Sequence, residues 1–181
     1  MAINDTQYII SPYMANLLVP TQLRKIITRA IRKLPNIRFD SIAFRGMSGA
    51  IIAPFIAAKL NKQLIMVRKN DNSAHSICRV EGYSKVKRYI IVDDFVETGK
   101  TAATIYFEIK DFAPSAECLG ILAVADSFIG ERAEFIKLEK LKNNYLHQWQ
   151  ECSKAKVKEV DKKKVKNKSL RKSKRKTTSK I

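Results

Sequence analysis

The sequence predicts an α/β domain with a mainly parallel sheet flanked by helices. Three observations support this fold class. Short apolar runs typical of buried strands alternate along the chain with longer helical patterns. Charged or turn residues bound each run, and no apolar run approaches the roughly twenty residues that cross a membrane. The first 152 residues are enough to build one such core.

The expected elements follow one another in the order of a doubly wound sheet. An amphipathic helix is expected over residues 20–34, with apolar residues at helical spacing on one side. Pro54 argues against continuity of the helix that follows the first strand. The remaining expected elements are strands near 39–44, 63–68, 87–93 and 117–125 and helices near 48–60 and 101–112.

Residues 89–101, YIIVDDFVETGKT, bring carboxylates and a phosphate-binding pattern together. Four apolar residues read as a buried strand, Asp93 and Asp94 follow it, and Thr98 to Thr101 begin a helix. A helix start offers unpaired N–H groups and the positive end of the macrodipole to a phosphate. Adjacent carboxylates suit vicinal sugar hydroxyls or a hydrated Mg²⁺. The stretch therefore predicts a site for a phosphorylated sugar.

This stretch resembles the phosphoribosyl pyrophosphate (PRPP) motif of type I phosphoribosyltransferases, which has four apolar residues, two acids and a Thr-Gly-x-Thr turn. The resemblance implies a twisted, mainly parallel sheet with a small hood. It implies that Asp93 and Asp94 are catalytic, hold the ribose hydroxyls and bind Mg²⁺, in part through water. It also implies that five consecutive residues wrap the 5-phosphate: Glu97, Thr98, Gly99, Lys100 and Thr101.

Glu97 is a further catalytic candidate. Purine-type members of the family resemble this sequence in carrying an acid at this position, where it would receive the proton of a purine nitrogen. The alternative is a solvent-facing loop acid beside Lys100. The resemblance therefore favours a purine base, although Glu81-Gly82 has features of the orotate enzymes.

A second segment, RGMSGA, resembles the pyrophosphate loop of the family, with Arg45 as a cation and Gly46 allowing close backbone approach. A plain strand-to-helix turn is the alternative. Arg68 and Lys69 resemble a pair that precedes the catalytic loop and could also hold pyrophosphate. A long polar loop, 68–83, is expected to be a lid, and the candidates to reach the leaving group from it are Lys69, His75, Ser76 and Arg79.

The resemblance implies an enzyme that transfers the 5-phosphoribosyl group from PRPP to a nucleobase, with Mg²⁺ as cofactor and pyrophosphate as by-product. The alternative is a regulator that senses PRPP or a nucleotide on the same fold, with nucleic acid bound by its basic tail. Both acids, the phosphate loop and the lid are present, which favours the enzyme.

Charge divides the chain at residue 152. The net charge is +18, and residues 153–181 contribute +12 of it, from 14 Lys and Arg and 2 acids. This tail is expected to be disordered; it could bind nucleic acid, carry a localisation signal, or only improve solubility. Residues 1–152 are expected to form the catalytic domain, with the hood built from 1–20, 126–150 or both.

Three scattered cysteines and no secretory signal favour a reducing, cytoplasmic setting, or the nucleus if the host is eukaryotic. No membrane partner is expected. A homodimer is a further expectation, because dimers are common among the proteins that the sequence resembles.

Overall fold

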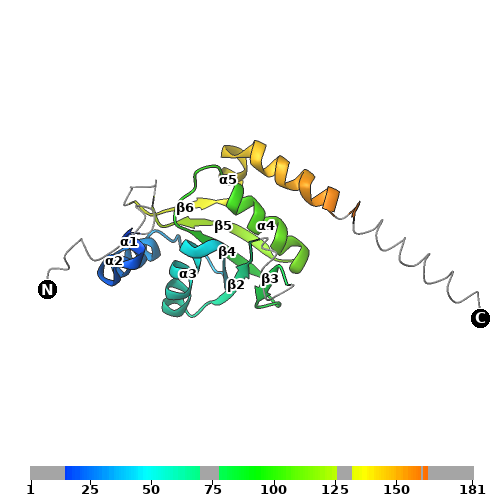
Figure 1. The fold of residues 1–181 in the computed structure, drawn as a ribbon. Coiled ribbons are helices and arrows are strands. Elements are labelled where there is room, and N and C mark those ends of the chain that lie inside the picture. Colours follow the sequence, from blue (N-terminus) through cyan, green and yellow to red (C-terminus); the bar gives the residue numbers. More distant parts are fainter. Residues whose placement is uncertain (1–14, 70–77, 126–131, 160, 163–181) are drawn as a thin grey trace, which may run out of the picture.

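A computed structural model describes residues 15–69, 78–125, 132–159 and 161–162. Within these residues six strands form one sheet (Figure 1). The strands are β1 (Ser41–Phe44), β2 (Gln63–Val67), β3 (Val80–Gly82), β4 (Arg88–Asp93), β5 (Glu117–Ala123) and β6 (Glu134–Lys137). The order is β3-β2-β1-β4-β5-β6. The four central strands are parallel, as predicted, and β3 and β6 add antiparallel edges.

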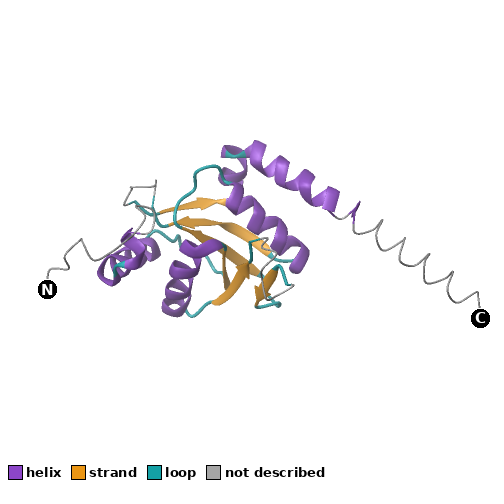
Figure 2. Ribbon diagram, in the orientation of Figure 1, coloured by secondary structure: helices purple, strands orange, loops and turns teal. Residues whose placement is uncertain are grey.

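Helices cover both faces of the sheet (Figure 2). They are α1 (Ala15–Leu18), α2 (Pro20–Arg32), α3 (Gly46–Leu60), α4 (Lys100–Phe112) and α5 (Leu138–Asn144), and residues 146–159 are also helical. One face packs against α1, α2 and α3, and the other packs against α4, α5 and the start of the last helix. The predicted α/β architecture is thus confirmed.

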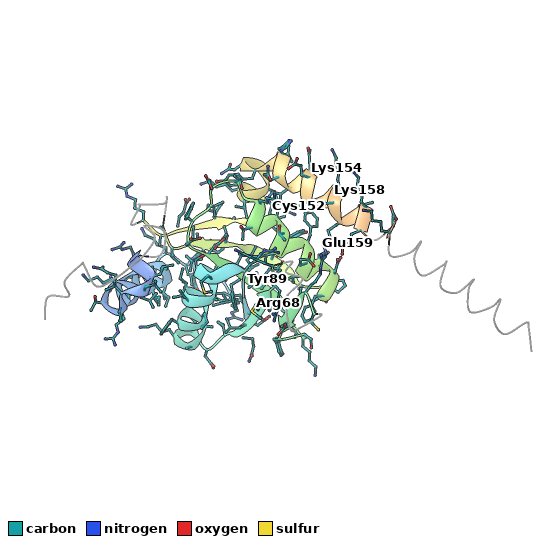
Figure 3. The ribbon with its side chains drawn as sticks, in the orientation of Figure 1. Arg68, Tyr89, Cys152, Lys154, Lys158 and Glu159 are labelled. Atoms are coloured by element: carbon teal, nitrogen blue, oxygen red, sulfur yellow. The ribbon has the colours of Figure 1, made fainter. Side chains whose placement is uncertain are left out.

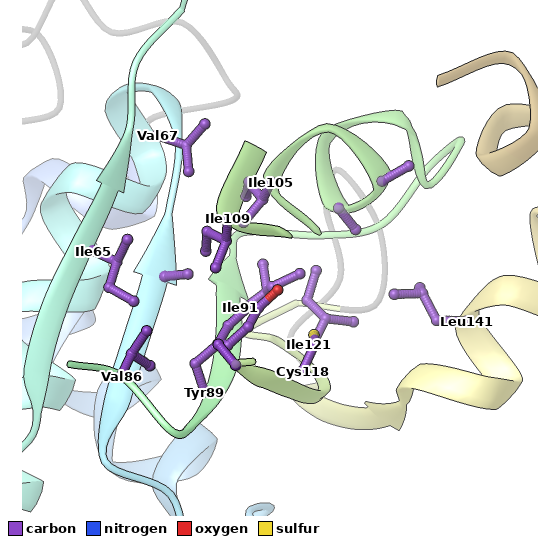
Figure 4. Close-up of a cluster of buried hydrophobic side chains, with 14 of the residues drawn as sticks. Ile65, Val67, Val86, Tyr89, Ile91, Ile105, Ile109, Cys118, Ile121 and Leu141 are labelled. Carbon is purple, nitrogen blue, oxygen red and sulfur yellow. The ribbon is translucent and has the colours of Figure 1, made fainter. Parts of the chain in front are cut away.

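The central strands are buried on both faces because their side chains alternate between two apolar clusters. Ile90 and Val92 of β4 belong to the cluster under α3, whereas Tyr89 and Ile91 belong to the cluster under α4. Figure 4 shows the second cluster, where Ile105 and Ile109 of α4 lie over the sheet. This packing fixes β4, whose last residue is Asp93.

The position of the candidate site follows from the order of the strands. After β1 the chain crosses to β2 on one side, and after β4 it crosses to β5 on the other side. β1 and β4 are parallel neighbours, so their carboxyl ends lie together at the switch point of the sheet, where ligands of such folds bind. This placement brings residues 45–46 next to residues 93–94.

Three helices were expected within one or two residues of their observed bounds, but α3 runs unbroken through Pro54. The helix expected over 48–60 is therefore present as one helix, and the argument from Pro54 against its continuity is not borne out. Packing explains the difference, since Ile52, Ala53, Ile56 and Ala57 are all buried against the sheet and hold the helix on both sides of the proline.

Two segments differ most from expectation. The expected loop 68–83 contains β3. Residues 132–150, the described part of a segment expected to supply a hood, form β6, α5 and the beginning of the last helix. Residues 153–159, assigned to the tail, continue that helix along α4 (Figure 3). Lys156 holds it there through Glu108 and Asp111, each at 2.9 Å. These pairs are between distant residues, so composition does not reveal them.

None of the helices in the described ranges is long and apolar enough to cross a membrane.

Candidate active site

A cavity of about 270 Å³ lies at the carboxyl ends of β1 and β4. Its lining comes from the β1–α3 turn, Lys69 after β2, the loop between β4 and α4 with the start of α4, and Ile121 of β5. The residues of the lining include Arg45, Gly46, Ser48, Lys69, Asp93, Asp94 and every residue from Phe95 to Thr101. The predicted acids and the predicted phosphate loop therefore face one space.

Asp93 and Asp94 are buried at the back of this cavity, at 6% and 9% exposure. The backbone N–H of Asp94 donates to Oδ1 of Asp93 at 3.1 Å, and the N–H of Phe95 donates to Oδ1 of Asp94 at 3.0 Å. The other oxygen of Asp94, Oδ2, is buried and has no hydrogen-bond partner within the described residues. A buried carboxylate oxygen without a partner is costly, so the site suits a ligand that supplies a donor or a cation.

The pKa of Asp93 is raised well above its usual value, first by burial and then by the neighbouring carboxylate of Asp94. The positive charge of Lys69 opposes this shift. A ligand that donates hydrogen bonds or brings a cation to the pair would relieve the repulsion.

The loop after the acids leads into α4. Gly99 is the N-cap of the helix and has a left-handed conformation, φ +70°, that an L side chain rarely adopts. Its carbonyl accepts the N–H of Ala103 at 2.9 Å, and the hydroxyl of Thr98 accepts the N–H of Lys100 at 3.4 Å. The positive end of the helix dipole therefore faces the cavity, with the exposed side chain of Lys100 beside it.

Tyr145, which belongs to the segment 126–150 expected as hood material, contacts this loop, and the sequence did not predict that contact. Its hydroxyl donates to the carbonyl of Val96 at 3.3 Å. A Cβ placed on Gly99 would lie 2.6 to 2.9 Å from carbon atoms of Tyr145, so the tyrosine packs directly on the glycine. Tyr145 is 49 positions from Val96 in the chain and almost as far from Gly99, so no local sequence pattern indicates these contacts.

The structure brings together some, but not all, of the residues predicted to bind pyrophosphate. Gly46 has a φ of +78°, and Cε of Lys69 lies 3.2 Å from the position of an added Cβ. Arg45 is the N-cap of α3, and burial lowers the pKa of its guanidinium. Arg68, by contrast, is absent from the cavity lining and pairs with Glu81 across β2 and β3 at 2.8 Å. His75 and Ser76 lie outside the described residues.

Comparison with known proteins identifies the family. The model of the family PRTase-CE matches residues 8–179, nearly the whole chain. The chain belongs to the PRTase-CE family. This match confirms the predicted membership among type I phosphoribosyltransferases.

Curated relatives agree with the PRTase-CE assignment. Orotate phosphoribosyltransferase of Staphylothermus marinus is 34% identical over 94 residues, which cover 50% of this chain and 46% of the relative. The enzyme of the same name from Staphylococcus haemolyticus is 30% identical over 86 residues, covering 47% and 42%. This PRTase-CE chain thus spans less than half the length of the curated relatives that it matches.

Solved structures support the fold of the PRTase-CE chain. UMP synthase of Leishmania donovani superposes with a TM-score of 0.54 at 22% identity, over 80% of this chain and 32% of the other. Orotate phosphoribosyltransferase of Aeropyrum pernix superposes with a TM-score of 0.53 at 15% identity, over 71% and 78%.

The Mg²⁺ that the PRTase-CE family implies fits the residues present. Within the described ranges, no group of three or more His, Cys, Asp and Glu side chains is arranged to hold a metal ion. Mg²⁺, however, commonly takes one or two carboxylates together with substrate oxygens and water. The buried pair of Asp93 and Asp94, with the unpartnered Oδ2 of Asp94, offers that kind of incomplete donor set.

Proposed function

We propose that this chain transfers the 5-phosphoribosyl group from PRPP to a nucleobase and releases pyrophosphate. One observation carries the proposal: the buried acid pair and the N-terminus of α4 line the same cavity. Hydroxyl donors and a phosphate are the complementary groups for these two features, and a phosphorylated ribose holds both.

The roles of the residues follow from their placement. Asp93 and Asp94 accept hydrogen bonds from the ribose hydroxyls, and the five residues from Glu97 to Thr101 surround the 5-phosphate. The pyrophosphate lies near Arg45, Gly46 and Lys69, where two cations meet a backbone turn. Arg68 would take part only after leaving Glu81.

Displacement at the anomeric carbon needs charge stabilisation on the leaving pyrophosphate. Arg45 and Lys69 supply positive charge at the cavity from the protein. Asp93 and Asp94 would hold Mg²⁺ in part through water, and the metal would supply further positive charge to the leaving group. We include His75 and Ser76 as candidates to reach the leaving group.

The nucleobase is a separate part of the proposal. Glu97 is exposed and lines the cavity, where it could receive a proton from an incoming purine nitrogen. The names of the curated relatives favour orotate as the second candidate. The hood over the base would come from the segment 1–20, the segment 126–150, or both.

The test is a panel of adenine, guanine, hypoxanthine, xanthine, orotate and uracil incubated with Mg²⁺-PRPP, with pyrophosphate release as the readout. Release that depends on one base or one class of base supports the transferase and names the substrate. Replacing Glu97 with Gln should lower turnover about tenfold or more if this carboxylate is the base. If no base causes pyrophosphate release, the proposed transferase activity is contradicted.

The second candidate function is a regulator that binds PRPP or a nucleotide and engages nucleic acid. The +12 charge of residues 153–181 favours it, because Lys and Arg neutralise nucleic-acid phosphates. Tight PRPP binding without pyrophosphate release for any base of the panel would support this function. Deleting residues 163–181 should then abolish retention of DNA or RNA at low salt and leave PRPP binding unchanged.

A homodimer in the cytoplasm completes the proposal. α3 exposes Phe55 at 53% and, at the cavity, Met47 at 68%, and exposed apolar side chains of this size suit contact with a second copy. Free Cys78, Cys118 and Cys152 are compatible with a reducing compartment. Light scattering after size exclusion tests the dimer, and Phe55→Glu should produce a monomer.

A further inference from the structure

The loop between β4 and α4 is contacted by Tyr145 of the C-terminal segment. The Tyr145 hydroxyl donates to the Val96 carbonyl at 3.3 Å, and the Tyr145 side chain packs on the backbone of Gly99. Val96 and Gly99 bracket Glu97 and Thr98, so Tyr145 contacts both ends of the segment that leads to the helix start. Each of these loop residues lines the cavity.

Tyr145 is itself fixed on both sides along the chain. It is the C-cap of α5, its N–H donates to the carbonyl of Leu141 at 3.2 Å, and its carbonyl accepts the N–H of Trp149 at 3.2 Å. Leu141 is fully buried and Trp149 is 5% exposed, with its ring centroid 5.0 Å from that of Tyr106 on α4. The tyrosine is therefore anchored to the domain core rather than to the loop alone.

The left-handed conformation of Gly99 and the packing of Tyr145 both require glycine at position 99. An L side chain at Gly99 would be strained by its φ of +70° and would also meet Tyr145 within 3.0 Å. With glycine at this position the tyrosine side chain occupies the space that a Cβ would take.

We propose that Tyr145 is a positioning residue for the 5-phosphate: it holds residues 96–99 in the conformation that presents the N-terminus of α4 to the phosphate. A loop ordered in advance loses less entropy when the ligand binds, which increases affinity. The inference rests on the proposed function, because it assumes that this loop receives the phosphate of a phosphoribosyl group.

Two variants separate the two contacts. Tyr145→Phe keeps the ring on Gly99 and removes the hydrogen bond to Val96, whereas Tyr145→Ala removes both. Leu146→Ala is the matched control, since Leu146 is the next residue and is 56% exposed. Affinity for ribose 5-phosphate is measured by calorimetry for the full chain, and KM and kcat for PRPP are measured with the base that the panel identifies.

The expected effect is on binding and not on turnover. Loss of one hydrogen bond should weaken ribose 5-phosphate binding about fivefold in Tyr145→Phe, and Tyr145→Ala should weaken it further, by about twentyfold or more. KM for PRPP should rise in parallel with little change in kcat. A purely structural defect would lower the active fraction, and so kcat, without changing the KM of the folded enzyme.

Gly99→Ala provides a rescue experiment. In the wild-type background the added methyl group meets Cβ, Cγ and Cδ2 of Tyr145 at 2.6 to 2.9 Å, whereas a Tyr145→Gly background removes all three of these atoms. Gly99→Ala should therefore weaken binding by a larger factor when Tyr145 is present than when it is absent. Equal factors in the two backgrounds would show that the residues are not coupled and would overturn the inference.

The outcomes distinguish this inference from the proposed function. If the wild type binds neither ribose 5-phosphate nor PRPP, both are overturned. If the wild type binds these ligands and Tyr145→Ala binds them equally well, only the role of Tyr145 is overturned. If binding weakens as expected but no base is converted, the positioning role of Tyr145 is supported and the proposed transferase activity is contradicted.

Discussion

Oδ1 of Asp93 accepts a hydrogen bond from the backbone N–H of Asp94 at 3.1 Å. The next residue repeats the arrangement, since the N–H of Phe95 donates to Oδ1 of Asp94 at 3.0 Å. One oxygen of each carboxylate is thus engaged by the backbone. This fixes the orientation of two buried acids whose negative charges repel, and a ligand can then stabilise the pair.

Asp94→Asn tests the acid pair through affinity. The substitution keeps the size of the side chain but removes the charged acceptor, and a hydrogen bond to a charged group contributes about 1.5–3 kcal/mol. Affinity for Mg²⁺-PRPP in a calorimetric titration should therefore fall about ten- to hundredfold. Glu139→Gln, which removes an exposed carboxylate of α5, is the control and should bind like the wild type. Equal affinity of Asp94→Asn and the wild type would remove this residue from the site.

The raised pKa of Asp93 predicts how stability depends on pH. Because burial and Asp94 raise the pKa in the folded state, the folded chain holds more protons than the unfolded chain between the two pKa values. The free energy of unfolding should therefore fall as the pH rises through this interval.

Asp93→Asn does not ionise and isolates the effect. Its melting temperature should match that of the wild type at about pH 4, near the pKa of an unfolded Asp, and exceed it increasingly as the pH rises. Mg²⁺-PRPP should oppose the destabilisation of the wild type, because it binds the ionised pair. A difference between the two proteins that stays constant with pH contradicts the assigned pKa shift.

Lys156 of the last helix can be tested with Lys158 of the same helix as its control, and Figure 3 labels Lys158. The Lys156 ammonium lies 2.9 Å from the largely buried carboxylate of Glu108, whereas Lys158 is exposed. Lys156→Met should lower the free energy of unfolding by about 2 kcal/mol, since Arg79 remains beside Glu108 at 3.2 Å. Lys158→Met should change it by less than about 0.5 kcal/mol. Equal effects in urea unfolding would show that the helix is not docked.

The sequence predicts well the features that depend on residues close together in the chain. The apolar run ending at Asp93, the two acids and the glycine at the start of α4 lie within a few residues of one another, and each has a direct structural consequence. The bounds of the four central strands follow from the same kind of pattern. The position of Arg45 and Gly46 beside the acids follows once a parallel sheet is assumed.

Contacts between distant segments explain what the sequence did not predict. The pairing of β3 with β2 and of β6 with β5 depends on tertiary packing of short strands. The lysine-rich segment after residue 152 has the composition of a disordered tail, yet Lys156 and Glu159 pair with groups on α4 and at Arg79. Charge counts do not reveal which lysines meet a partner.

The three cysteines should differ in reactivity toward an aromatic disulfide reagent. Burial raises the pKa of the Cys118 thiol to about 12, and the side chain is 5% exposed, so it should react only in denaturant. Cys78 is exposed and should react first, followed by the half-buried Cys152. Mass spectrometry of the labelled peptides gives the order. Fast labelling of Cys118 in the native protein would contradict its burial beneath α4.

A crystal structure with ribose 5-phosphate would show whether the acid pair and the start of α4 bind the same ligand. The ribose hydroxyls should lie within hydrogen-bonding distance, about 2.5–3.0 Å, of the Asp93 and Asp94 carboxylates. The phosphate should contact the backbone of residues 98–101 at the start of α4. A phosphate bound elsewhere, or hydroxyls directed away from both acids, would contradict this placement of the ligand.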